Sequence, residues 1–487
     1  MSEPRRQHPV AALTNVLRIL REMLIPILII LIVGGGGERP LMQNLVGLGF
    51  LVTILLGWGI LSWIFYSYRI EEDELRIEYG IFVKKKLYIP RHRIQVIDVT
   101  AGPVQRLFGL VSLKVQTAGE TKPEAEISAV TRQTADQIRE TLMPDEAVDA
   151  EADDHSQAFG TRNNILSSRY ISRKHLLIAA STSGSFGVVL SILGTIFAQA
   201  DHVVSESEIE AFVEQAAQSG TQILIIAAII MVILAWLLAL LGTLIRFAGF
   251  TVSKKKDELI IQRGLFERKT MTIPYKRIQA VRIVEGILRQ PFGYATLYVE
   301  SAGYGDEGGQ STVLFPLIHR SRINEFIEEM VPEYADTADL TKPPPRAVIR
   351  YMIKTSLPVL IISGIITLAS AGGYYLLGLI LPAILWGVLR HKDARIGSTD
   401  KTLIMRFRRL ARTTAFIKKY RIQSADTSST FFQRRRDLIS VSATVASGSS
   451  GSTFTVDELD LSYRSAFINW LVERRKSQST KVAEART

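Results

Sequence analysis

The stretch Ile89-Pro90-Arg91-His92-Arg93-Ile94-Gln95 recurs 184 residues later as Ile273-Pro274-Tyr275-Lys276-Arg277-Ile278-Gln279. The surrounding blocks, Gly80–Gly119 and Gly264–Gly303, align without a gap and are identical at 15 of 40 positions. A weaker third copy contains Arg421-Ile422-Gln423. Internal repeats of this length indicate that one structural unit is used more than once. The chain therefore consists of one module used three times.

Long apolar segments separate the copies. Leu45–Tyr66, Leu176–Ala200 and Ile223–Ile245 have 22 to 25 residues each and no charge, and roughly 20 apolar residues cross the hydrocarbon of a bilayer. Met23–Gly37 is shorter, whereas Thr355–Leu389 is long enough for a hairpin of two helices. We expect about six membrane spans in three pairs, with each pair preceding one repeat.

The distribution of Lys and Arg predicts the topology. These residues flank the pairs, and the connections inside the pairs contain only Arg39. By the positive-inside rule, both termini and all three repeats are expected on the cytoplasmic side. The connection Asp201–Gln222 carries five acidic residues and no Lys or Arg, so it is expected outside. The first apolar segment has no small-residue cleavage pattern after it, which favours a retained anchor.

The predicted organisation follows from these segments. It comprises a first transmembrane pair (1–66), a first strand-rich domain (67–143), an acidic linker (144–175), a second transmembrane pair (176–245), a second domain (246–335), a Pro-rich linker (336–354), a third transmembrane hairpin (355–389), a divergent basic domain (390–476) and a tail (477–487).

Each repeat is predicted to be an α+β unit. Short runs of alternating polar and apolar residues, such as Glu74–Tyr79 and Val111–Val115, are typical of half-buried strands. Each repeat then ends in apolar residues at helical spacing, for example Ala135, Ile138 and Leu142. We expect a small antiparallel β roll with a C-terminal helix over its open end.

The order of paired membrane helices, the Ile-Pro-x-x-Arg-Ile-Gln motif, Phe-Gly and a terminal helix resembles the bacterial pleckstrin-homology-like domain family. The threefold arrangement resembles the YdbT-like group of that family, over almost the whole chain. The resemblance implies three pleckstrin-homology-like rolls at the inner face of a bacterial plasma or inner membrane. It also implies lipid or protein binding without catalysis, and a smaller single-repeat membrane protein of the same family as a partner.

The third copy departs from the pattern. Lys418 replaces the proline, Arg408 replaces the glycine of the first turn, and Arg436-Asp437 replaces Phe-Gly. A divergent copy can lose a shared ligand or present a different surface. The family resemblance therefore says least about the function of this third copy.

The recurring motif residues are expected to be structural. Proline belongs at a strand end, because it cannot donate to a ladder. The arginines are expected to pair with carboxylates or cap carbonyls, with a ligand phosphate as the alternative. The glutamines should hydrogen-bond neighbouring backbone, the glycines should form a bend, and the phenylalanines should fill the core. The residues are Pro90, Arg93, Gln95, Phe108, Gly109, Pro274, Arg277, Gln279, Phe292, Gly293, Arg421 and Gln423.

Positive charge is concentrated in the third domain. Residues 390–487 contain 20 basic and 9 acidic side chains, an excess equal to the net charge of +11 of the whole chain. A basic domain beside an anionic leaflet is attracted to it, and arginine forks match phosphate oxygens. The candidate anionic-lipid surface comprises Arg406, Arg408, Arg409, Arg412, Lys418, Lys419, Arg434, Arg435 and Arg436.

Other readings of this basic surface stay open. An acidic protein partner, such as the chain's own segment Asp145–Asp154, is one alternative, and a solvated face is another. Nucleic acid also binds basic surfaces, but it is not expected here because the membrane supplies an anionic partner at high effective concentration.

The sequence gives little support to catalysis. The seven histidines are scattered, no nucleotide-binding glycine loop or metal-binding histidine pair is present, and there is no cysteine. No catalytic, cofactor or metal site is therefore predicted. The alternative function is a transporter or lipid-handling protein that acts through its helices. The three uncharged segments Leu45–Tyr66, Leu176–Ala200 and Ile223–Ile245 contain no Asp, Glu, Lys, Arg or His, which are the residues that mark transport pathways.

Overall fold

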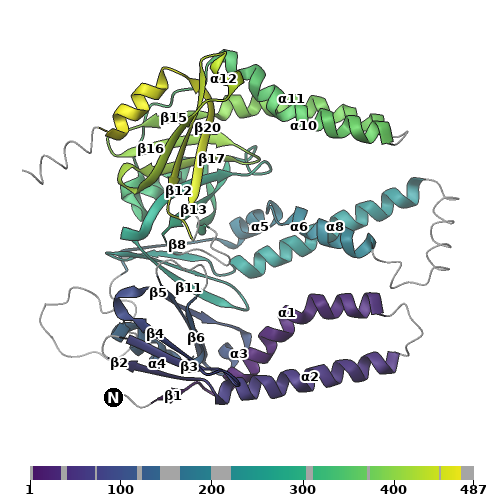
Figure 1. Ribbon diagram of the computed structural model, residues 1–487, viewed down its shortest axis with the longest axis vertical. Helices are drawn as coiled ribbons and strands as arrows, with labels where there is room; N and C mark the ends of the chain where they lie inside the picture. The colour runs from purple at the N-terminus through teal and green to yellow at the C-terminus, as the bar shows by residue number, and fades with distance from the viewer. Residues whose placement is uncertain are drawn as a thin grey trace, which may run out of the picture. The chain divides into compact units, whose positions relative to one another are not determined.

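The computed structural model describes residues 4–34, 41–71, 74–117, 123–142, 165–198, 221–302, 311–369, 373–448 and 451–472 (Figure 1). The chain divides into two compact units, Met1–Thr272 and Ile273–Thr487. Several predicted features lie wholly or mostly outside the described residues. They are Arg39, Ala118-Gly119, Asp145–Asp154, Asp201–Gln222 and the tail 477–487.

The first unit contains two antiparallel sheets. The four-stranded sheet has the order β1-β2-β3-β4, from β1 (Arg5–Arg6), β2 (Ser67–Glu71), β3 (Glu74–Tyr79) and β4 (Lys85–Pro90). The seven-stranded sheet has the order β7-β6-β5-β11-β10-β9-β8. It joins β5 (Ile94–Ala101), β6 (Leu110–Thr117) and β7 (Ala125–Thr131) of the first repeat to β8 (Ser167–Tyr170), β9 (Thr251–Lys254), β10 (Glu258–Arg263) and β11 (Arg268–Pro274) of the second.

The second unit repeats this arrangement. Its six-stranded sheet has the order β14-β13-β12-β17-β16-β15, and its three-stranded sheet has the order β18-β19-β20. The strands of the second repeat are β12 (Ile278–Glu285), β13 (Tyr294–Ser301) and β14 (Thr312–His319). Those of the third repeat are β15 (Arg395–Ser398), β16 (Thr402–Arg408), β17 (Arg412–Lys418), β18 (Ile422–Ser428), β19 (Leu438–Val445) and β20 (Ser452–Asp460). In both units, therefore, a sheet crosses from one repeat into the next.

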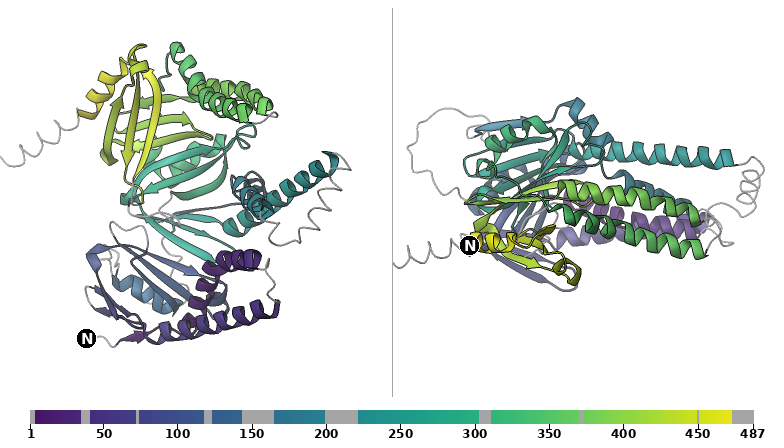
Figure 2. Two further views of the ribbon diagram at one scale, coloured as in Figure 1. Left: turned by 45° about the vertical axis from the view of Figure 1, so that its right-hand side comes forward. Right: turned by 90° about the horizontal axis from the view of Figure 1, so that it is seen from above.

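The predicted rolls and terminal helices are present. In the first repeat, α4 (Arg132–Leu142) buries Ala135, Ile138 and Leu142 against the sheets. In the third, the sheet containing β16 faces β20 across a core that includes Met405 and Val456, and a helix at 463–472 adds Phe467 to it (Figure 2). α9 (Ile323–Met330) of the second repeat likewise buries its apolar side chains.

The apolar segments form helices, but fewer spans are shown than the six predicted. The helices are α1 (Val10–Gly34), α2 (Leu41–Ile64), α5 (Arg173–Ser181), α6 (Phe186–Ala198), α8 (Thr221–Phe247), α10 (Val348–Ala369) and α11 (Ile380–Asp393), the last preceded by η7 (Gly373–Leu379). Among the described residues, three stretches are long and apolar enough to cross a membrane: Ile225–Phe247, Pro345–Leu368 and Gly373–Asp393. A fourth is reached only if the bent pair α5–α6 counts as one span.

Polar side chains explain the bend between α5 and α6, which measures 48°. The Thr182 hydroxyl donates to the Ile178 carbonyl at 2.6 Å, and the hydroxyls of Ser183 and Ser185 lie 2.7 Å apart. Such local hydrogen bonds compete with the helical ladder. The hydroxyl-rich segment predicted as part of one straight span is therefore the place where the helix breaks.

Each helix pair starts and ends at neighbouring backbone. β1 precedes α1 and α2 and pairs with β2, which follows them, with Arg5 opposite Tyr68. β8 and β9 bracket α5, α6 and α8 in the same way, with Arg169 opposite Val252. In the second unit, an isolated bridge joins Thr341 before α10 to Ile396 after α11. The residues just before and just after each group of helices are therefore neighbours in the fold.

The motif glycines are required by the backbone. Gly109 and Gly293 have φ values of 66° and 69°, and Asp437 at the same repeat position has φ 50°. This left-handed conformation favours glycine, and aspartate is among the residues that tolerate it best. The third copy thus keeps the predicted bend without the glycine.

Ion pairs fasten the third helix hairpin to its roll. Arg346, Arg350 and Lys354 follow one another at intervals of four residues and face acidic residues of β20. Arg350 Nε lies 2.8 Å from Glu458 Oε2, and the Glu458 side chain is fully buried. Lys354 Nζ contacts Asp457 Oδ2 at 3.0 Å. Basic residues that the sequence predicted only as topology signals therefore also hold the roll.

Replacing Arg350 with Met should destabilise this junction, because the buried Glu458 carboxylate would lose its main partner. We expect a cost of about 3 kcal/mol, at the low end for a broken buried pair because Lys354 stays 3.7 Å from the same carboxylate. Arg346→Met removes an exposed ion pair in the turn just before this helix, and it should cost clearly less because Asp460 stays solvated. Urea unfolding of the purified chain in detergent measures both. An equal loss of unfolding free energy in the two variants would contradict the special importance of the buried Arg350–Glu458 pair.

Candidate membrane-binding surface

The second hairpin turn of every repeat exposes apolar side chains. These turns connect β3 to β4, β10 to β11 and β16 to β17. Phe82 is 87% exposed, Phe266 55% and Leu410 71%, and the three occupy the same repeat position. Val83 and Leu265 beside them are also exposed. We call these five residues the hairpin tips.

Each hairpin tip lies against the helix that leads into its roll. The ring of Phe82 lies 6.2 Å from that of Trp58 in α2. The Leu265 amide donates to the Ile245 carbonyl near the end of α8 at 2.9 Å. In the third repeat, Trp386 of α11 donates from Nε1 to the Arg409 carbonyl beside Leu410 at 3.1 Å. In each repeat, therefore, this turn contacts the preceding apolar helix, through a ring contact, a backbone hydrogen bond or a side-chain hydrogen bond.

A second loop in each repeat is also apolar and exposed. It follows β5, β12 or β18 and includes α3 (Pro103–Leu107) and α12 (Phe431–Arg434). Its exposed apolar residues are Leu107, Phe108, Ile287, Leu288, Phe292, Phe431 and Phe432. Phe108 is 53% and Phe292 66% exposed, so the prediction that these two fill the core is wrong. The Phe-Gly match reflects a shared turn with an outward aromatic side chain.

Exposed apolar residues gathered next to apolar helix ends are typical of a surface that meets lipid. Soluble proteins rarely gather such residues without a partner. Tryptophan is enriched where a helix passes from hydrocarbon to headgroups, and Trp58 lies six residues before the end of α2. Trp386 lies in the middle of α11. The hairpin tips and second loops have the chemistry of an interfacial surface.

The structure divides the nine candidate basic residues into two groups. Arg408 and Lys418 are buried, so they do not belong to a surface. Arg408 pairs with Asp393 at 2.5 Å, and Lys418 with Asp336 at 3.0 Å. Arg406, Arg412 and Lys419 have partners too: Thr414, Glu285 and the Trp470 carbonyl. Five of the nine are therefore buried or half-buried and have partners within the fold.

Two of these arginines have perturbed pKa values. Hydrogen bonding to Glu285 raises the pKa of Arg412, and Asp393 adds to the effect. Burial lowers the pKa of Arg406. The effect on Arg412 reflects strand pairing inside the second unit, where Glu285 of β12 lies opposite Arg412 of β17. The sequence alone did not reveal these ion pairs, because the acidic partners are far from the arginines along the chain. Carboxylates of this protein, rather than lipid phosphates, supply the opposite charge.

The other four candidates lie at the surface. Arg409, Arg434, Arg435 and Arg436 are exposed. Arg435 stacks over the ring of Phe431 at 4.6 Å, and Arg436 donates to the Arg346 carbonyl at 3.3 Å. Arginine beside exposed aromatic rings combines a charged fork for phosphate with apolar side chains for the interface.

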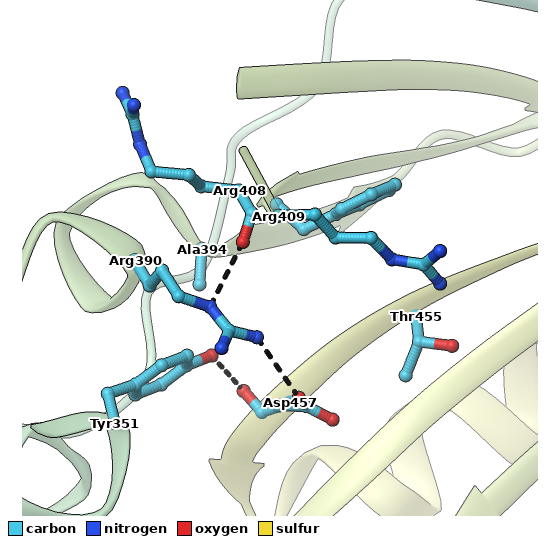
Figure 3. A pocket seen from close by; sticks show the side chains of 8 residues that line it. Tyr351, Arg390, Ala394, Arg408, Arg409, Thr455 and Asp457 are labelled. Atoms are coloured by element: carbon cyan, nitrogen blue, oxygen red, sulfur yellow. Dashed lines mark hydrogen bonds and ion pairs between the residues drawn. The ribbon is translucent and has the colours of Figure 1, made fainter. Parts of the chain in front are cut away.

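A pocket of about 220 Å³ opens beside Arg409 (Figure 3). It is lined by Tyr351, Arg390, Ala394, Phe407, Arg408, Arg409, Thr455 and Asp457. Arg390 donates to the Arg408 carbonyl at 3.1 Å and lies 4.0 Å from the Asp457 carboxylate. The guanidinium of Arg409 points toward the β20 side of the pocket (Figure 3). This pocket places one exposed cation at the base of the third helix hairpin.

The remaining motif residues have mainly structural contacts. Arg93 pairs with Glu124 at 3.9 Å, and Gln279 donates to the Arg277 carbonyl at 3.0 Å. Arg421 donates to the Lys276 carbonyl. Pro90, Pro274 and the replacing Lys418 each end a strand and start a short 3₁₀ turn, whereas Gln423 is exposed. The side chain of Gln95 lies outside the described residues.

No cluster of at least three potential metal ligands from His, Cys, Asp and Glu occurs within the described part of the chain.

The comparisons with known proteins identify the repeats. The family model for the bacterial PH domain matches residues 16–145, 191–332 and 355–475. The transmembrane protein YdbT of Bacillus subtilis (strain 168) is 32% identical over 488 residues, covering 96% of this chain and 98% of YdbT. The transmembrane protein YdbS of the same organism is 30% identical over 77 residues, or 16% of this chain and 46% of YdbS. The chain therefore belongs to the bacterial PH domain family, as a YdbT-like membrane protein with three repeats.

Proposed function

We propose that this protein is a non-enzymatic scaffold that holds three PH-like rolls against the inner face of a bacterial membrane. The observation that carries the proposal is the contact between the hairpin turn and the preceding apolar helix in all three repeats. It fixes exposed apolar side chains where an apolar helix leaves the bilayer. The rolls then lie on the membrane surface, ready to bind lipid headgroups and protein partners.

The placement of strands around the helix pairs supports a single membrane face for all rolls. Each helical excursion returns to the backbone position from which it started, as with Arg5 opposite Tyr68. Lys and Arg flank these excursions, which favours the cytoplasmic side. Both termini are accordingly assigned to the cytoplasm.

Anionic lipid is the proposed ligand of the third roll. Arg409 and Arg435 are exposed beside Leu410 and Phe431, which are exposed too. Each well-placed basic residue near an anionic leaflet contributes about 1 kcal/mol. The pocket beside Arg409 offers room for a headgroup at the base of the third helix hairpin.

Protein partners of the same family fit this scaffold. The smaller relative YdbS matches one segment of this chain, which supports a single-repeat membrane protein as one partner. Such a partner would add one more roll to the three rolls of this chain.

The break between α5 and α6 favours a second function. Interrupted helices line substrate paths in many transporters. However, the hydroxyls at this break bond to each other and to α8, where Ser185 lies 3.4 Å from Thr243. We therefore place lipid handling through the helices second to the scaffold.

Cysteines at positions 207 and 401 test the proposed topology, because the chain has no native cysteine. A membrane-impermeant maleimide should label Ser207→Cys in intact cells and Lys401→Cys only after permeabilisation. Labelling of Lys401→Cys in intact cells would contradict a cytoplasmic third roll.

The hairpin tips should lie within the membrane interface. A fluorophore on Leu410→Cys in the reconstituted chain should be quenched by lipids with quenchers near the headgroups. Lys401→Cys is the matched control, because the seven residues of β16 separate it from the tip by about 20 Å. The control should be quenched much less. Similar quenching at both positions would show that the hairpin tip lies no deeper in the membrane interface than the other end of β16.

Loss of Arg409 and Arg435 should weaken retention of anionic phospholipid. Native mass spectrometry of the detergent-purified full chain should show fewer bound anionic lipids for Arg409→Ser/Arg435→Ser, with a loss of about 1 kcal/mol per contact. Lys342→Ser/Lys401→Ser removes the same charge from other exposed positions and should bind like the unaltered chain. If both double variants lose lipid equally, net charge rather than this surface is responsible.

A further inference from the structure

The repeats are joined by one type of strand pairing. β11 of the second repeat pairs with β5 of the first, and β17 of the third pairs with β12 of the second. Ala101 lies opposite Arg268 in one junction, and Glu285 lies opposite Arg412 in the other. These are the same repeat positions, 184 and 144 residues apart. Both junctions therefore use the same two edges in the same register.

The chain ends with one unused copy of each edge. β4 is the first-repeat equivalent of β11 and β17, and β18 is the third-repeat equivalent of β5 and β12. Among the described residues, β4 pairs only with β3, and β18 pairs only with β19. An open edge presents unpaired N–H and C=O groups that can template another strand.

The unpaired edge strands are more exposed than their paired equivalents. Five of the eight residues of β12 are buried, whereas β18 contains no buried residue. β17 has five buried residues of seven, whereas β4 has one of six. Strands that are buried inside the chain thus have exposed equivalents at its two ends.

A side-chain contact accompanies each internal junction. Arg106 of the first repeat donates to the Leu265 carbonyl in the hairpin turn of the second. At the next junction Gln290, the equivalent of Arg106, accepts from Arg408 Nη2 at 2.6 Å. Arg408 lies one residue before Arg409, the equivalent of Leu265. The third-repeat equivalent of Arg106 is Arg434, which is exposed and whose guanidinium makes no hydrogen bond or ion pair within the described part of the chain.

We propose that β18 of one copy of this chain pairs with β4 of a second copy, in the register of the two internal junctions. Ser428 would then lie opposite Lys85, and Asp426 opposite Leu87. Lys85 would reach Asp426 diagonally on the same face of the sheet, a favourable pairing of opposite charges. Arg434 would donate to the carbonyl of Ile81, as Arg106 does to that of Leu265.

A second copy is the occupant that these observations favour, because it always brings the matching edge and the same hairpin turn. The contact is head-to-tail, so it produces a ring or an open row according to its rotation. The inference rests on the proposed function in one respect: rolls on one membrane face can meet edge to edge in that plane.

Disulfide formation between two differently tagged copies tests the pairing. Ser428→Cys in one full-length copy should link to Lys85→Cys in the other in native membranes, and neither variant should form dimers alone. The internal pair Thr100→Cys/Lys269→Cys occupies the same repeat positions and should close within one chain. Thr427→Cys with Lys85→Cys places the thiols on opposite faces and should not link.

Arg434→Ser should lower the linked fraction, whereas its neighbour Arg435→Ser should leave it unchanged. The inference is overturned if the internal pair closes and the mixed copies do not link. It is also overturned if Lys85→Cys is captured instead by a smaller single-repeat relative. Failure here with hairpin tips still quenched by lipid would leave the scaffold intact, since tip insertion needs only one copy.

Discussion

The contact between each hairpin turn and the apolar helix before it is the constraint that fixes a roll relative to its helix. A roll tethered only by its chain would turn freely above a membrane. Here a turn of the roll contacts the helix that leads into it. Trp58 and Phe82 make a ring contact, whereas Ile245 and Leu265, and Trp386 and Arg409, are joined by hydrogen bonds. The position of the roll follows from this contact, and so does the exposure of the neighbouring aromatic side chains.

Backbone pairing between repeats adds a second constraint. Because β5 and β12 each accept a strand from the following repeat, their hydrogen-bonding groups are satisfied within the chain. The rolls are consequently elements of shared sheets rather than separate domains on flexible linkers. This explains why a chain with three repeats contains only two compact units, each with one junction between repeats.

The sequence predicted the repeat, the roll and its terminal helix well, because these depend on local alternation and helical spacing, as in Ala135, Ile138 and Leu142. It could not show which basic residues are free. Arg408 and Arg412 meet Asp393 and Glu285 only after the chain folds. Phe292 was misread because identity between copies does not distinguish a core residue from a repeated surface residue.

A cryo-electron microscopy map of the full chain in nanodiscs containing anionic lipid tests the central claim most directly. The account predicts that Phe82, Phe266 and Leu410 all lie within the density of the lipid headgroups on one face of the disc. A map in which the three rolls stand clear of the bilayer, joined to it only by the helices, would contradict it.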